Sequence, residues 1–124
     1  MKIRLTAGLL LTVGAMGCGG STVAGVTKKQ ADAINAATTK TCDSYERCGE
    51  VGAGKSYTNR ADCDTARKSF WNDRWPVADC DNKINGSNLQ LCLDAIASTS
   101  CTSFLDQLNT VYNKCAKADV CNGG

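Results

Sequence analysis

Nine cysteines in a chain of 124 residues constrain this sequence more than any other feature. Eight of them lie between residues 42 and 121 with the spacing C-x5-C-x14-C-x16-C-x11-C-x8-C-x13-C-x5-C, whereas Cys18 stands apart near the N-terminus. An even set of cysteines in a small exported domain is typical of a disulfide framework. We therefore expect four disulfides among Cys42, Cys48, Cys63, Cys80, Cys92, Cys101, Cys115 and Cys121.

The residues before Cys18 explain why the ninth cysteine stands apart. Lys2 and Arg4 precede an apolar run at residues 5–13, and small Gly17 comes directly before the cysteine. This order predicts a bacterial lipoprotein signal peptide at residues 1–17, with Cys18 as the lipidated first residue of the mature protein. Residues 18–26 then form a short tether, and residues 27–124 form the domain. The apolar run is too short for a permanent span, so we expect membrane contact through the lipid alone.

The charge balance argues against one class of partner. The chain has 14 basic and 12 acidic residues, and removal of Lys2 and Arg4 leaves 12 of each. No segment gathers basic residues with interleaved aromatics, which is the usual footprint of a nucleic-acid binder. We therefore expect no nucleic-acid partner. The expected location is the bacterial cell envelope, where the lipid-anchored domain faces the periplasm or the cell surface.

Apolar residues recur at helical spacing in four segments. The pattern predicts helices over residues 28–48 and 60–74, a third beginning near residue 87, and a fourth carrying residues 101–115. Thr27 and Gln30 have the spacing of a capping box, and residues 79–86 have the composition of a loop. Strand patterns are scarce. The expected fold is all-α: a small four-helix domain stapled by disulfides.

The spacing restricts disulfide pairing without fixing it. Cys42 and Cys48 lie six residues apart on one predicted helix, about 9 Å along its axis, whereas bonded cysteines need Cα atoms within about 7 Å. They should therefore not pair with each other. The preferred bridge is Cys48–Cys63, which would join the end of the first helix to the start of the second.

Residues 49–56, Gly-Glu-Val-Gly-Ala-Gly-Lys-Ser, match the phosphate-binding pattern G-x-x-x-x-G-K-[ST]. A P-loop needs a buried strand before the glycines and a helix directly after them. The preceding segment here is polar and helical in period. We therefore expect a turn between helices, and no phosphate bound by Lys55.

Oxygen-bearing side chains also gather between residues 79 and 85, at Asp79, Asp81, Asn82 and Asn85. The glycine and late glutamate of an EF-hand loop are missing, so turn chemistry is the preferred interpretation over a calcium site. We expect no metal and no cofactor.

Catalysis has few candidate residues. The chain contains no histidine, which removes Ser–His and Cys–His pairs, and complete disulfide pairing removes thiolate nucleophiles. We expect a non-catalytic binding, scaffolding or accessory role. The alternatives are a small extracytoplasmic enzyme and a secreted inhibitor-like module.

Trp71 and Trp75 lie four residues apart and share one face of the predicted second helix. They could form a face for an unknown protein or small-molecule partner. A small domain more often uses its largest side chains in its own core, and we expect this for at least Trp71. Phe70, near the face that carries Cys63, is also expected in the core.

Several of these features occur together in a known family. Residues 42–52, with Cys42-Asp43 and Cys48-Gly49, the Lys55-Ser56-Tyr57 loop, and the Trp71-Asn72-x-x-Trp75 segment resemble small cysteine-rich lipoproteins of myxobacteria. The resemblance implies an exported, disulfide-bonded protein without an assigned activity. Some members are labelled as natural-product-biosynthesis lipoproteins, which implies a link to such a pathway. The resemblance supplies no catalytic residue.

Overall fold

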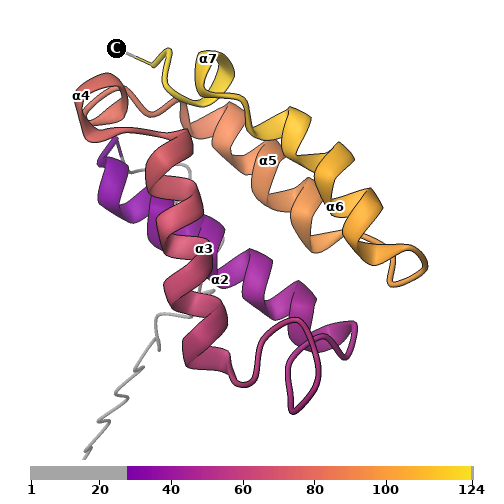
Figure 1. The fold of residues 1–124 in the computed structure, drawn as a ribbon. Coiled ribbons are helices and arrows are strands. Elements are labelled where there is room, and N and C mark those ends of the chain that lie inside the picture. The colour runs from indigo at the N-terminus through magenta and orange to yellow at the C-terminus, as the bar shows by residue number, and fades with distance from the viewer. Residues whose placement is uncertain (1–27, 124) are drawn as a thin grey trace, which may run out of the picture.

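The computed structural model describes residues 28–123, which form an all-α fold (Figure 1). The four longer helices are α2 (Gln30–Arg47), α3 (Arg60–Arg74), α5 (Gly86–Ala97) and α6 (Phe104–Val111), the last continued by the 3-10 helix η1 (Tyr112–Cys115). Two single-turn helices, α4 (Val77–Cys80) and α7 (Lys117–Val120), complete this part of the chain. The all-α prediction is confirmed. The predicted signal peptide, Cys18, the tether and Thr27 lie outside the described residues.

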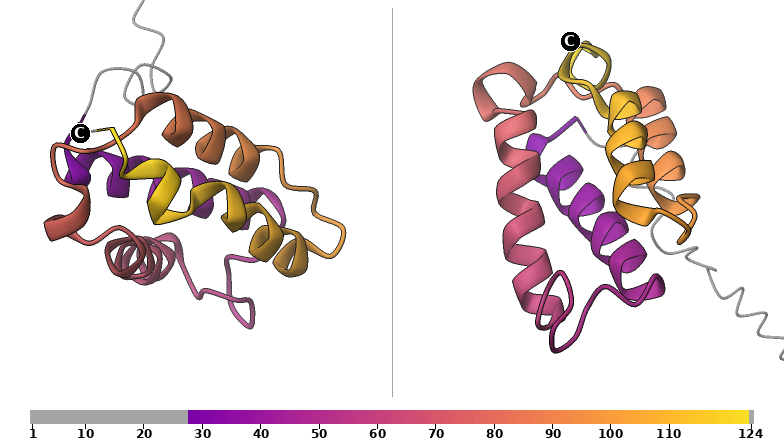
Figure 2. Two further views of the ribbon diagram at one scale, coloured as in Figure 1. Left: turned by 90° about the horizontal axis from the view of Figure 1, so that it is seen from above. Right: turned by 45° about the vertical axis from the view of Figure 1, so that its right-hand side comes forward.

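Helix α2 holds the domain together because it packs against two neighbours. It contacts α3 on one side and α5 on the other, and α5 in turn contacts α6, η1 and α7. Figure 2 shows the same arrangement, with the α5–α6 pair lying beside the α2–α3 pair. The core is formed where these helices meet, by Ile34 and Ala37 of α2 and by Leu89, Leu93 and Ile96 of α5.

Local capping explains why two helices begin where the sequence predicted. The Asn59 side chain accepts a hydrogen bond from the Asp62 amide at 2.9 Å, and α3 has the predicted bounds of residues 60–74. The Asn85 side chain likewise accepts from the Asn88 amide at 3.0 Å at the start of α5. Side-chain caps of this kind satisfy amides that have no partner within the helix.

The start of α2 differs from the predicted capping box. Lys29 is the N-cap and forms no side-chain cap bond. Instead, Asp81 accepts a hydrogen bond from the Gln30 amide at 3.1 Å, while the Gln30 side chain donates to the Trp75 carbonyl at 2.7 Å. The cap therefore comes from a distant segment, and Gln30 ties α2 to the end of α3.

The helical parts of the C-terminal half were only partly predicted. Residues 77–80 form a helix that runs into the predicted loop at residues 79–86, and residues 117–120 form another that was not predicted, because a single turn is too short to show helical periodicity. Cys101 lies in the loop before α6 and not on that helix.

All eight cysteines from Cys42 to Cys121 are paired in four disulfides. The pairs are Cys42–Cys63, Cys48–Cys101, Cys80–Cys121 and Cys92–Cys115. The exclusion of Cys42–Cys48 is confirmed, whereas the preferred Cys48–Cys63 bridge is wrong. Six residues turn an α-helix by about 600°, so positions with this spacing point about 120° apart, and Cys48 follows α2 directly as its C-cap. Cys42 consequently faces α3, and Cys48 faces the loop before α6.

The two tryptophans of α3 are part of the core. Trp71 and Trp75 are both 0% exposed, and their ring centroids lie 4.7 Å apart. Each indole NH has a buried acceptor: Thr41 Oγ1 at 3.3 Å for Trp71 and the Cys115 carbonyl at 2.9 Å for Trp75. The alternative of a partner face at these residues is therefore wrong for the folded domain. Phe70 is only half-buried, contrary to the prediction.

Candidate functional site

The glycine loop at residues 49–56 does not have the surroundings of a phosphate-binding loop. Helix α2, and not a strand, precedes it, and Cys48 at its start is bonded to Cys101. Val51 and Tyr57 form an isolated bridge, which closes the loop on itself. The Ser56 hydroxyl, the group that a P-loop uses to bind Mg²⁺, instead donates to the Glu50 carboxylate within the loop at 2.7 Å.

The oxygen-rich residues 79–85 are used within the protein. Asp79 forms an ion pair with Lys117 at 3.0 Å, and Asp81 caps α2. Asn82 accepts from the Lys29 ammonium, while Asn85 caps α5. Within residues 28–123 there is no group of three or more His, Cys, Asp or Glu side chains that could hold a metal ion.

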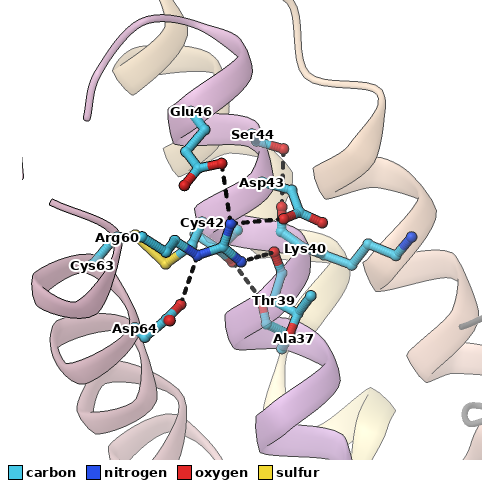
Figure 3. A network of polar contacts seen from close by, with 11 residues as sticks. Ala37, Thr39, Lys40, Cys42, Asp43, Ser44, Glu46, Arg60, Cys63 and Asp64 are labelled. Carbon is cyan, nitrogen blue, oxygen red and sulfur yellow. Dashed lines mark hydrogen bonds and ion pairs between the residues drawn. A yellow bond between two sulfur atoms is a disulfide. The ribbon is translucent and has the colours of Figure 1, made fainter. Parts of the chain in front are cut away.

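A polar network around Arg60 joins α3 to α2. The Arg60 guanidinium lies 2.9 Å from Asp64, 2.9 Å from Asp43 and 3.3 Å from Glu46. Figure 3 shows it reaching from α3 to α2 beside the Cys42–Cys63 disulfide. Hydrogen bonding, above all to Asp64, raises the pKa of Arg60. The three carboxylates are about half exposed, so the network is a surface feature that orients Arg60 more than it stabilises the fold.

Arg60 forms one wall of a polar groove between α2 and α3. The groove has a volume of about 330 Å³, and Asn35, Thr39, Asp64 and Lys68 also line it. Thr38 of α2, which is only 5% exposed, also lines the groove, and its hydroxyl oxygen has no hydrogen-bond partner. The groove therefore presents an amide, hydroxyls and charges of both signs. Such groups suit hydrogen bonding to a polar ligand.

A second cluster surrounds Arg67 with aromatic rings. Its guanidinium carbon lies 4.7 Å from the Phe70 ring centroid and 5.9 Å from that of Tyr45, and it donates to the Tyr112 hydroxyl at 3.2 Å. Burial raises the pKa of Tyr45 to about 12 and also raises the pKa of Tyr112, although the nearby Arg67 charge opposes both shifts. The cluster thus joins the end of α2 to the middle of α3 and to η1 through cation–π and ring contacts and a hydrogen bond.

The raised pKa of Tyr45 makes the stability of the domain sensitive to alkaline pH. Its ordinary value is 10.0, so the unfolded chain releases this proton before the folded chain does. The free energy of unfolding should hold below about pH 10 and fall as pH rises toward 12. In urea unfolding series at several pH values, Tyr45→Phe should lose less stability over this interval than wild type. Equal losses would contradict this account.

Sequence analysis identified neither arginine cluster. Arg60 and Asp64 lie four residues apart on α3, so the sequence alone could have predicted an ion pair between them. The partners Asp43 and Glu46 lie on α2, which packs against α3 and is bonded to it by Cys42–Cys63. Because neither this packing nor the pairing of Cys42 could be derived from the sequence, the network could not be derived either.

These features define a class: a small all-α domain held by four disulfides, with a polar groove on its surface. The chain belongs to a family of unknown function, DUF6184, whose model matches residues 42–123. The match includes all eight paired cysteines and leaves out Cys18. No curated protein and no solved structure matches the chain.

Proposed function

We propose that this protein is a lipid-anchored, non-catalytic module of the bacterial cell envelope. The division of its cysteines carries the proposal: all eight cysteines of the domain are in disulfides, which leaves Cys18 alone for another use. Four disulfides indicate an oxidising, extracytoplasmic environment. No helix within residues 28–123 is long and apolar enough to cross a membrane.

Lipid attachment at Cys18 would account for retention at a membrane. A thioether diacylglycerol together with an amide-linked acyl chain provides the several chains that stable anchoring needs, whereas one chain binds reversibly. Lipoprotein character also agrees with the resemblance to the myxobacterial proteins. The proposed role extends, through that resemblance, to accessory work in natural-product biosynthesis.

The groove between α2 and α3 supports the binding part of the role. Its charged residue Arg60 is fixed in place by three carboxylates, so it is oriented before any ligand arrives. Preorganised groups lose less conformational freedom on binding. We propose that this groove contacts a polar segment of a partner protein or a small molecule with several hydrogen-bonding groups.

Lipid anchoring can be tested by metabolic labelling with an alkyne fatty acid. Wild type should incorporate the label and appear in the membrane fraction. Cys18→Ser should carry no label and leave that fraction, with its four disulfides intact as a control for folding. Equal labelling of the two proteins would contradict the proposal.

The binding role can be tested by photo-crosslinking in intact cells. A benzoylphenylalanine introduced at exposed Thr39, on the groove, should yield a discrete adduct, whereas the same residue at exposed Thr110 on α6 serves as the matched control. Adducts of equal yield at both positions, or none at Thr39, would contradict a binding role for the groove.

A further inference from the structure

The four disulfides differ in their exposure to solvent. Both cysteines of Cys42–Cys63 and of Cys92–Cys115 are fully buried, and Cys80 of the Cys80–Cys121 pair is also 0% exposed. Cys101, by contrast, is exposed, and its partner Cys48 is half-buried. Cys121 is half-buried like Cys48, so Cys48–Cys101 differs from the other three bridges in having an exposed cysteine, and it is the bridge most open to a thiol from solvent.

A positive charge lies beside one sulfur of this bridge. Arg47 Nη1 is 3.9 Å from Cys101 Sγ, and Arg47 Nη2 donates to the Thr99 carbonyl at 2.9 Å, which holds the guanidinium in place. A neighbouring cation stabilises a thiolate, so Cys101 is the better leaving group of the two. Cys48 is the C-cap of α2, where the negative end of the helix dipole disfavours a thiolate.

A cavity lies next to the same bridge. It has a volume of about 410 Å³ and is lined by Cys101, Glu50, Ser103, Phe104, Leu105 and Asp106. Leu105 is 48% exposed and provides an apolar wall, while Glu50 and Asp106 add polar groups. The cavity lies beside Cys101, the leaving sulfur, and offers room there for residues of a partner that is bonded to Cys48.

We propose that Cys48–Cys101 is a thiol–disulfide exchange site that captures a thiol-bearing partner. The partner thiolate attacks Cys48 Sγ, the bond between the two sulfurs breaks, and its electron pair leaves on Cys101 Sγ as a thiolate beside Arg47. The product is a mixed disulfide between Cys48 and the partner. Return attack by Cys101 on Cys48 releases the partner thiol and restores the bridge. This inference does not depend on lipid anchoring, and the exchange is stoichiometric.

The other bridges allow this exchange without loss of the fold. Cys42–Cys63 still joins α2 to α3, and Cys92–Cys115 still joins α5 to η1. Opening Cys48–Cys101 releases only the link between the end of α2 and the loop before α6. Ser44 continues to donate to the Ile96 carbonyl at 3.1 Å, which keeps α2 against the end of α5.

The proposal can be tested with reduced glutathione as the probe thiol. The folded, oxidised protein is treated near pH 7, quenched with iodoacetamide and analysed by peptide mapping. Cys48 should carry glutathione and Cys101 should carry the alkyl group, while the other three bridges stay closed. A thiol-bearing peptide used in parallel distinguishes small thiols from protein partners, since a faster reaction with the peptide assigns the cavity to protein recognition. Opening of another bridge at an equal rate, or glutathione found on Cys101, would overturn the assignment.

Substitution of Arg47 separates the charge effect from simple accessibility. Arg47→Gln should slow the opening of Cys48–Cys101 about threefold or more, because the leaving thiolate loses its neighbouring cation. Arg47→Lys should restore part of the rate, and Lys114→Gln, a surface charge change elsewhere, should leave it unaltered. Merely loosening the loop would speed the reaction, so an unchanged or faster rate in Arg47→Gln would overturn the proposal.

Discussion

Replacing Trp71 with alanine is expected to lower the free energy of unfolding by about 3–5 kcal/mol, the range for removing a large buried aromatic side chain. Trp71 is 0% exposed and lies 4.7 Å from Trp75, 4.9 Å from Phe70 and 5.3 Å from Tyr112, measured between ring centroids. The substitution therefore leaves a cavity at the junction of α2, α3 and η1. Urea unfolding with intact disulfides measures the loss.

Leu91→Ala provides the matched control for this experiment. Leu91 is a large apolar residue that is 61% exposed on α5, so its truncation should change stability by no more than about 0.5 kcal/mol. A Trp71→Ala protein with an unfolding curve near that of wild type would contradict the core role. Such a result would favour the alternative that Trp71 belongs to an exposed face that binds a partner.

Removal of the Cys92–Cys115 bridge should also have a large effect. Chain-entropy arguments for a loop of this length give a loss of about 3 kcal/mol in the double variant Cys92→Ala/Cys115→Ala. Both sulfurs are fully buried, so packing losses add to that figure. The bridge joins α5 to η1, and its loss should lower the melting temperature with the other three bridges intact. Thr110→Ala, an exposed change on α6, is the control, and a melting temperature equal to that control would show that the bridge is not needed.

Local sequence signals were sufficient for the best-predicted helix. Asn59 supplies the cap that starts α3, and Pro76 prevents continuation past its end, so both boundaries are set by nearby residues. Helix α2 was predicted over a similar range, but its start depends on Asp81, a residue 51 positions away. Contacts at that distance in sequence leave no periodic pattern.

The candidate sites were harder to predict from the sequence than the helices, because they depend more on tertiary contacts. Both tryptophans were placed on one face of α3, yet burial of that face is set by how α2 and η1 pack against it. Phe70 lies beside this face and is half-buried under Arg67 instead of filling the core. The total of four disulfides followed from the eight cysteines that remain when Cys18 is set aside, whereas their connectivity required the three-dimensional fold.

The division of nine cysteines into eight paired and one lipidated is the central claim, and the mass of the mature protein tests it most directly. Protein extracted from cell membranes without reductant, analysed intact and then fragmented, should begin at Cys18 and carry diacylglycerol and acyl chains on that residue. Its polypeptide should be eight hydrogens lighter than the reduced chain, as four disulfides require. An unmodified Cys18, a disulfide that involves it, or a free thiol among the other eight cysteines, apart from Cys101 in a protein whose Cys48 carries a partner thiol, would contradict the claim.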